Sequence, residues 1–106
     1  MTPLTRYPGH PYNQSRVREG HSGAFEEHYG PSGTWVRLFR KGRGFRRTML
    51  LRDRSTPGRY MTIDVWDSLR SYRSFLRRHA GAYRALDRLC HALTRRERRV
   101  GRFEAP

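Results

Sequence analysis

Apolar residues recur every three or four positions across the second half of the chain, and this spacing predicts a long amphipathic helical region. The region follows Asp67 and Ser68, which are both suited to cap a helix N-terminus. We expect Gly81 to divide it into two helices, because a glycine inside a helix costs about 1 kcal/mol relative to alanine. The repeating positions are Leu69, Tyr72, Leu76, His79 or Ala80, Tyr83, Leu86, Cys90 and Leu93.

Two shorter helices are predicted in the first half. The first covers residues 21–29 and ends before Pro31, which cannot continue it. After Pro31, Trp35, Leu38 and Phe39 fall on one helical face. We expect that face to pack against a sheet.

A β-hairpin is predicted between these two helical regions. Its strands are residues 45–52 and 60–66, and the turn at 55–58 contains a Pro-Gly pair. In the first strand we expect Phe45, Met49 and Leu51 on one side and Leu50 on the other. The second strand alternates Met61, Ile63 and Val65 with Tyr60, Thr62, Asp64 and Trp66. Both sides therefore carry bulky groups, which indicates that both faces of the sheet are covered.

The remaining segments give weaker patterns. Residues 1–14 contain three prolines and no apolar period, so they are expected to form a flexible arm outside a single domain of residues 15–106. Residues 15–19 are expected to form a short first strand, and residues 95–103 a final edge strand. The resulting order, strand-helix-helix-strand-strand-helix-helix-strand, predicts an α+β, ferredoxin-like split βαβ fold with a four-stranded antiparallel sheet.

Composition narrows the class of protein. The chain has 106 residues, 35% of them hydrophobic, and a net charge of +14, which fits one small domain. It contains no apolar run that could form a membrane span or a secretory signal, so a cytoplasmic location is expected. The single cysteine, Cys90, is interpreted as a core residue. Of the 23 basic residues only Lys41 is lysine, and such an imbalance is also what a coding bias would produce.

Several stretches resemble the antibiotic biosynthesis monooxygenase family. They are FEEHYGP (25–31), GTWVRLF (33–39), YMTIDVW (60–66), FLRRHA (75–80), YRALD (83–87) and LT (93–94), and the resemblance extends over roughly residues 16–103. It implies a dimeric α/β barrel, in which two subunits face each other through their sheets with the helices outside. Some members oxidise aromatic polyketide intermediates with O₂ and no cofactor, and others cleave haem or act on quinone-like compounds.

Particular positions separate these activities. Haem-degrading members use an Asn on the first strand, which Asn13 resembles, and a Trp and a His ten residues apart on the long helix. This chain has Phe75 and Ala85 at the two helical positions, so haem cleavage is not expected. The polyketide-oxidising members resemble this chain at Trp66 and Tyr72, but Thr62 replaces an expected Asn.

Cofactor-free oxygenation needs a base that deprotonates the substrate and a dry aromatic pocket that holds it. The hypothesis is a monooxygenase acting on a polyketide- or quinol-like aromatic compound, without metal or other cofactor. The catalytic candidates are Trp66, Tyr72, His79 and Asp64, and the substrate-binding candidates are Trp35, Phe39, Phe75 and Asn13. The simpler alternatives stay open: the aromatic residues are core, His79 is structural, and Asp64 pairs with an arginine.

Two other functions compete with catalysis. One is a dimer that binds a small apolar ligand without turnover. The other is nucleic-acid binding, because the pI near 11.5 favours contact with phosphate. Residues 41–45 (KGRGF) resemble the start of an RNA-recognition motif, but Arg46 and Arg47 do not continue it. The five histidines show no metal-ligand spacing, so no metal site is predicted.

Overall fold

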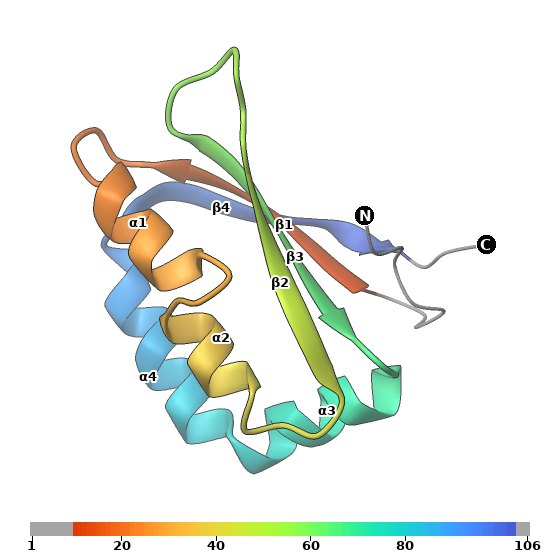
Figure 1. The fold of residues 1–106 in the computed structure, drawn as a ribbon. Helices are drawn as coiled ribbons and strands as arrows, with labels where there is room; N and C mark the ends of the chain where they lie inside the picture. The colour runs from red at the N-terminus through yellow and green to blue at the C-terminus, as the bar shows by residue number, and fades with distance from the viewer. Residues whose placement is uncertain (1–9, 104–106) are drawn as a thin grey trace.

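The computed structural model describes residues 10–103, in which four helices cover one side of a four-stranded sheet (Figure 1). None of the helices in this range is long and apolar enough to cross a membrane. In chain order the elements are β1 (His10–Val17), α1 (Ser22–Tyr29), α2 (Thr34–Phe39), β2 (Phe45–Arg52), β3 (Arg59–Trp66), α3 (Leu69–Arg78), α4 (Ala80–His91) and β4 (Thr94–Phe103).

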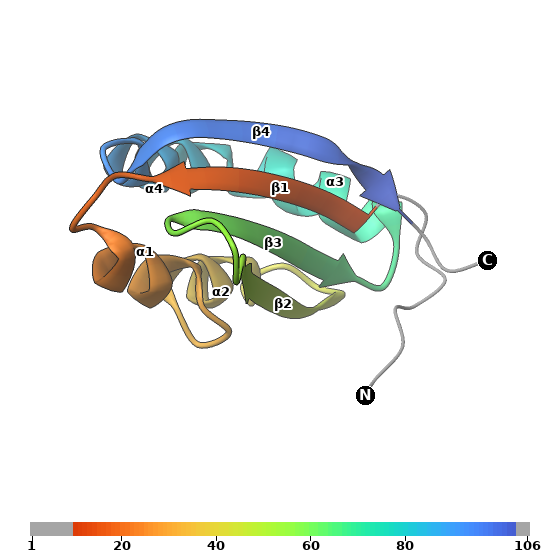
Figure 2. The same ribbon diagram turned by 90° about the horizontal axis from the view of Figure 1, so that it is seen from above.

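The sheet has the strand order β2-β3-β1-β4, and every neighbouring pair is antiparallel. β1 and β3 are therefore the central strands, and the view from above shows the four strands side by side, with α3 and α4 behind β1 and β4 (Figure 2). This arrangement confirms the predicted ferredoxin-like fold. The opposite side of the sheet, which no helix covers, is called the open face below.

Local sequence explains the element boundaries. The Ser68 side chain accepts a hydrogen bond from the backbone N–H of Ser71, which caps α3 as expected. The β2–β3 hairpin closes through Gly58, whose φ of +82° lies in the left-handed region that glycine tolerates. At the far end of the hairpin, the backbone N–H of Asp67 donates to the carbonyl of Gly44, where the chain also needs a positive φ.

β1 begins earlier than the sequence indicated. We expected a strand over residues 15–19 and an arm over 1–14, whereas the strand spans His10–Val17; residues 1–9 lie outside the described range. Pro11 did not favour a strand, because proline lacks the backbone N–H that a residue of a central strand donates to its neighbour. In the structure, pairing with β3 starts only at Tyr12, so at Pro11 the strand pairs with β4 alone.

Two further details differ from the expectation. Phe45 packs against Phe39 and Trp66 on the helix side, because an irregularity between Phe45 and Arg47 reverses the alternation of β2. The break in the long helical region falls at His79, where φ and ψ leave the helical range, and not at Gly81, which lies in the first turn of α4.

The core between sheet and helices consists of two clusters of buried side chains. The larger one joins α2, α3 and α4 to the end of β3 and contains Trp35, Leu38, Phe39, Trp66, Tyr72, Phe75, Leu86 and Cys90. The smaller one joins α1 to the start of β3 and contains Val17, Phe25 and Tyr60. Tyr29 packs against both clusters.

Trp66 is fully buried and contacts the rings of Phe39, Phe45, Tyr72 and Phe75. We expect Trp66→Ala to lower the free energy of unfolding by about 3–5 kcal/mol, because it removes apolar contacts and leaves a cavity. Urea denaturation followed by circular dichroism measures this change. Leu89→Ala is the control, since Leu89 is 61% exposed, and it should change stability by less than about 0.5 kcal/mol. Equal losses from both variants would contradict the assignment of Trp66 to the core.

Candidate functional site

A polar cleft lies between the sheet and the helix layer, at the middle of β3. The helix-facing side of β3 carries Tyr60 and Trp66 at its ends and the smaller Thr62 and Asp64 between them. The two aromatic residues pack in the two core clusters, so the helix layer is held at both ends while the centre stays open. The cleft has a volume of about 50 Å³ and is lined by Asn13, Tyr29, Trp35, Phe39, Thr48, Thr62, Asp64, Tyr83, Asp87 and Glu97.

Asp64 is the carboxylate at the centre of this cleft. The hydroxyl of Thr48, on the neighbouring strand β2, donates a hydrogen bond of 2.7 Å to its Oδ1. Burial raises the pKa of Asp64 to about 6, and the charge of Glu97 adds to that rise, while the Thr48 hydrogen bond opposes it. Asp64 therefore titrates near neutral pH, in the range suited to a general base.

Two other carboxylates, Glu97 and Asp87, line the cleft. Glu97 extends from β4, and the Ser15 hydroxyl lies 3.4 Å from its Oε2. Burial raises the pKa of Glu97, and the charge of Asp87 on α4 adds to the effect. No arginine, lysine or histidine is among the lining residues in the described range. The cleft is thus an acidic site inside a strongly basic chain.

Two tyrosines complete the polar lining. Burial raises the pKa of both Tyr29 and Tyr83 well above the usual range; the charge of Glu97 adds to this in both cases, and the charge of Asp87 adds to it for Tyr83. Both hydroxyls therefore keep their protons at any physiological pH and can act as hydrogen-bond donors, not as bases. The ring of Tyr83 meets Trp35 edge to face, with centroids 5.1 Å apart.

Four of the residues selected from the sequence meet in this cleft. Asp64, Asn13, Trp35 and Phe39 come from three different elements and line it together. Asp64 has no arginine partner among the described residues, so Thr48 takes the place of the expected ion pair.

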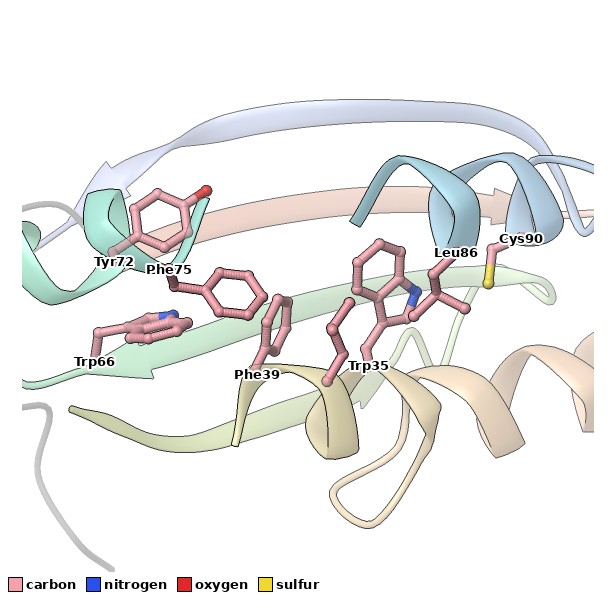
Figure 3. Close-up of a cluster of buried hydrophobic side chains, with 8 residues drawn as sticks. Trp35, Phe39, Trp66, Tyr72, Phe75, Leu86 and Cys90 are labelled. Carbon is pink, nitrogen blue, oxygen red and sulfur yellow. The ribbon is translucent and has the colours of Figure 1, made fainter. Parts of the chain in front are cut away.

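The other four selected residues lie outside the cleft lining. Trp66, Tyr72 and Phe75 are buried in the larger core cluster, and Figure 3 shows them grouped beyond Phe39, away from Trp35 and Cys90. The His79 ring packs on Phe75, with centroids 5.2 Å apart, and borders a separate basic groove beside α3. The structure thus separates His79 from Asp64, the other candidate base.

Comparison with known proteins assigns the chain to a family. The sequence model for antibiotic biosynthesis monooxygenases matches residues 11–85. The chain belongs to this family. None of the curated proteins matches it.

Solved structures with the same fold include a cofactor-independent oxygenase. SnoaB, a cofactor-independent oxygenase from Streptomyces nogalater, has a TM-score of 0.75 and 22% identity over 94% of this chain and 94% of that chain. A variant of SnoaB gives the same score and identity over 92% of each chain. PA3566 from Pseudomonas aeruginosa has a TM-score of 0.69 and 15% identity over 98% of this chain and 100% of that chain. At these identities the likeness establishes the shared fold.

Sequence reasoning missed several lining residues of this family member. Tyr83 and Asp87 are four positions apart on α4, so they share a helical face, and that spacing was a usable signal. Glu97 pairs with Ser15 in the sheet, and only the register of β4 against β1 reveals it. Among residues 10–103 no group of three or more histidine, cysteine or acidic side chains could hold a metal ion.

The raised pKa of Asp64 predicts how the free energy of unfolding depends on pH. A carboxyl group with a folded pKa near 6 and an ordinary value of 3.8 stabilises the fold below about pH 4, and that contribution is lost as the pH rises through 6. We expect Asp64→Asn to increase the free energy of unfolding by roughly 1–3 kcal/mol at about pH 8 and to change it little at about pH 4, as measured by urea denaturation.

Asp53 provides a control of opposite sign. The backbone N–H of Ser55 lowers the pKa of this partly exposed carboxyl, so Asp53→Asn should not stabilise the protein at pH 8. Stabilisation by both variants would show a general benefit of lost negative charge and would contradict the burial argument for Asp64.

Proposed function

We propose that this family member is a cofactor-independent monooxygenase that oxidises an uncharged, phenol-bearing aromatic compound with O₂, and that Asp64 is its base. The observation that carries the proposal is a carboxylate of pKa about 6 at the centre of a cleft walled by Trp35, Phe39 and two tyrosines. The fold shared with a cofactor-independent oxygenase supports the same reaction class.

The proposed reaction begins with proton transfer. Asp64 accepts the proton of a substrate phenol, and the resulting anion passes one electron to O₂. The two radicals combine to form a C–O bond, and the peroxide then takes up a proton. Loss of water from the hydroperoxide leaves a carbonyl, so the substrate loses two hydrogens and gains one oxygen while the other oxygen leaves as water.

The electrostatics of the cleft suit this transfer. A substrate anion added beside three carboxylates would be unfavourable. Proton transfer, however, neutralises Asp64 as it charges the substrate, so the total charge of the cleft is unchanged. The protonated Tyr83 and Tyr29 hydroxyls and the Asn13 amide can then donate hydrogen bonds to the developing oxyanion. Thr62, which replaces the Asn expected from polyketide-oxidising relatives, supplies a hydroxyl at the same wall.

Size and charge restrict the substrate. A cleft lined by Asp64, Asp87 and Glu97 without any cation disfavours a carboxylate-bearing substrate. Ligand pockets usually enclose about 300–1,000 Å³, whereas this cleft has about 50 Å³. An aromatic substrate therefore requires side chains of the lining to move. Asp87 and Glu97 are exposed and Tyr83 is partly exposed, so these side chains can move without disturbing the buried core.

Turnover should depend on the ionisation of Asp64. With an anthrone- or naphthol-like phenol, O₂ uptake should rise with pH through about 6 and then level off, and Asp64→Asn should reduce kcat/KM by about 10²- to 10⁴-fold. Thr48→Val removes the hydrogen bond that opposes the pKa rise, so its rate profile should shift to higher pH. Glu27→Gln, an exposed change on α1, is the matched control for lost charge.

Full activity of Asp64→Asn would refute its role as the base. If the wild-type protein binds the phenol tightly but consumes no O₂, the site is a ligand-binding module and the monooxygenase proposal fails.

The second part of the proposal is a homodimer formed through the open face. Met49, Leu51, Met61, Ile63 and Val65 alternate with the helix-facing residues of β2 and β3 and so form an apolar strip on this face. Ile63 and Val65 are buried within the chain, so Met49, Leu51 and Met61 are the members of the strip that a partner could cover. Leu51 is 49% exposed, and a second copy packed sheet to sheet would cover it. This is the arrangement that the family resemblance implies.

Sedimentation velocity tests the dimer. We expect the wild-type protein to sediment as a dimer, and Leu51→Asp to produce a monomer because a charge would be buried in the interface. Leu89→Asp makes the same charge change at a residue on α4 that is 61% exposed, and it should leave the mass unchanged. A wild-type monomer at micromolar concentration would contradict the proposal.

A further inference from the structure

A basic groove lies in the helix layer, between α3 and the loop that joins α2 to β2. Its volume is about 380 Å³, and its basic lining includes Lys41, Arg43, Arg70 and Arg78. The groove shares no lining residue with the acidic cleft, so what it binds does not depend on the proposed function.

The position of α3 keeps this groove away from the proposed dimer interface. Tyr72 and Phe75 of α3 pack on Trp66, which lies on the helix-facing side of the sheet. Figure 1 shows α3 at the lower end of the helix layer, where the chain also runs from α2 to β2. A second copy on the open face would contact the opposite side of the sheet, so the groove stays outside that interface.

The loop between α2 and β2 is held against α3 by close packing at Gly42. A Cβ atom at position 42 would lie 2.9 Å from Cδ1 of Phe75 and 3.1 Å from the Trp66 ring, so the loop approaches α3 this closely only because it has glycine there. The backbone N–H groups of Lys41 and Gly42 donate to carbonyls at the end of α2, at 3.0 and 2.9 Å. The backbone that carries Lys41 and Arg43 is therefore fixed relative to α3.

One face of α3 supplies the opposite wall of the groove. Arg70, Ser74 and Arg78 follow one another at intervals of four residues, and Ser71 lies three residues before Ser74, so all four share this face. The two serines are half-buried and the two arginines are exposed. The wall therefore combines hydroxyl groups with guanidinium groups that can reach over them.

The chain has few carboxylates that could neutralise this groove. None of its lysine and arginine side chains forms an ion pair within residues 10–103. Of the nine acidic side chains in the sequence, only Glu104 lies outside that range. Two of the others pair with arginines elsewhere, and three line the acidic cleft. A second copy has the same shortage of acids, so the charge of the groove favours an anion from outside the protein.

We propose that this groove binds the phosphate group of a small phosphorylated molecule. At pH 7 a phosphate monoester carries about 1.5 to 2 negative charges and three strong acceptor oxygens. Guanidinium forks match these oxygens in geometry, and serine hydroxyls can donate to them. A carboxylate has one charge and two oxygens, so it would leave more of these donors unused. The groove volume also lies within the range of about 300–1,000 Å³ that is common for small-molecule sites.

The lining favours a small molecule over single-stranded nucleic acid. Proteins that bind single strands stack bases on aromatic side chains. The ring of Phe75 is 1% exposed because it packs in the larger core cluster, and the His79 ring packs on it. The groove therefore presents charge and hydroxyl groups to a ligand and has no row of exposed aromatic rings.

Titration with glycerol 3-phosphate at about 0.15 M salt, followed by ¹H–¹⁵N NMR, tests the proposal, because this ionic strength screens nonspecific surface binding. We expect saturable shifts at the amides of residues 41–43 and 70–79, and Arg70→Gln/Arg78→Gln should weaken binding by tenfold or more. Arg73→Gln/Arg77→Gln removes the same charge from exposed positions of the same helix that do not line the groove, and it should leave the affinity within about twofold. Equal loss in both double variants, or shifts confined to other parts of the chain, would overturn the proposal.

Two measurements test whether phosphate is the group that is recognised. Ser74→Ala keeps every charge and should weaken glycerol 3-phosphate binding by about threefold or more, because one donor is lost. Acetate should bind at least tenfold more weakly than glycerol 3-phosphate to the wild-type protein. Unchanged affinity in Ser74→Ala, or equal affinity for acetate, would show attraction of any anion and would overturn the assignment to phosphate.

The remaining arms separate the possible sources of the phosphate and the role of a second copy. Tighter binding to a single-stranded oligonucleotide or to phosphatidic acid vesicles, with the same loss in Arg70→Gln/Arg78→Gln, would identify a nucleic-acid or membrane surface and overturn the small-molecule assignment. Leu51→Asp on the open face should leave the affinity for glycerol 3-phosphate unchanged. Loss of binding in that variant would place the site between two copies and contradict a groove formed by one chain.

Discussion

The order of side chains on one strand decides where this protein has a site. On the helix-facing side of β3, Tyr60 and Trp66 are large and aromatic, whereas Thr62 and Asp64 between them are small or charged. Helices can pack closely only on the two aromatic ends, where burial of apolar area is favourable. Above the centre of the strand, the helix layer cannot close without burying a carboxylate in a nonpolar environment, which is costly. The cleft forms because the helices pack on the aromatic ends of β3 and cannot pack on Asp64 at its centre. The same sequence of side chains on β3 therefore determines both the core and the candidate site.

The second consequence is electrostatic. The chain carries 23 basic residues, and none of those that the structure describes lines the cleft. Burial raises the pKa values of Asp64 and Glu97, and a neighbouring carboxylate adds to the rise in each case, while hydrogen bonds from the Thr48 and Ser15 hydroxyls oppose it. An arginine beside Asp64 would lower its pKa and remove its capacity to accept a proton near neutral pH. In this basic chain, the exclusion of arginine from the cleft matters more to its chemistry than the presence of any one acid.

The sequence was sufficient for the element order, because the periodicities of α3, α4 and β3 are strong and the Ser68 cap and the Pro-Gly turn act locally. It also selected Asp64, Asn13, Trp35 and Phe39, which the fold brings together in the cleft. The features that the sequence could not predict depend on contacts between distant segments. The extent of β1 is set by pairing with two neighbours, the side on which Phe45 lies is set by an irregularity, and Glu97 is placed by strand register. Aromatic residues such as Trp66, Tyr72 and Phe75 are also typical of a ligand pocket. Here they pack with residues of α2 in the larger core cluster.

Register also explains how acidic and basic sites can occupy the two faces of one strand. Along β1, Asn13 and Ser15 face the helices, and Gln14 and Arg16 face the open side. Because side chains alternate with a period of two, a slip of one residue would turn Arg16 toward the cleft and its carboxylates. Irregularities in the pairing with β4, between Tyr12 and Asn13 and between Arg16 and Val17, flank this segment on both sides. The register of residues 13–16 therefore keeps the acidic cleft on one face of the sheet, and Arg16 with its paired neighbours Arg59 and Arg96 on the other.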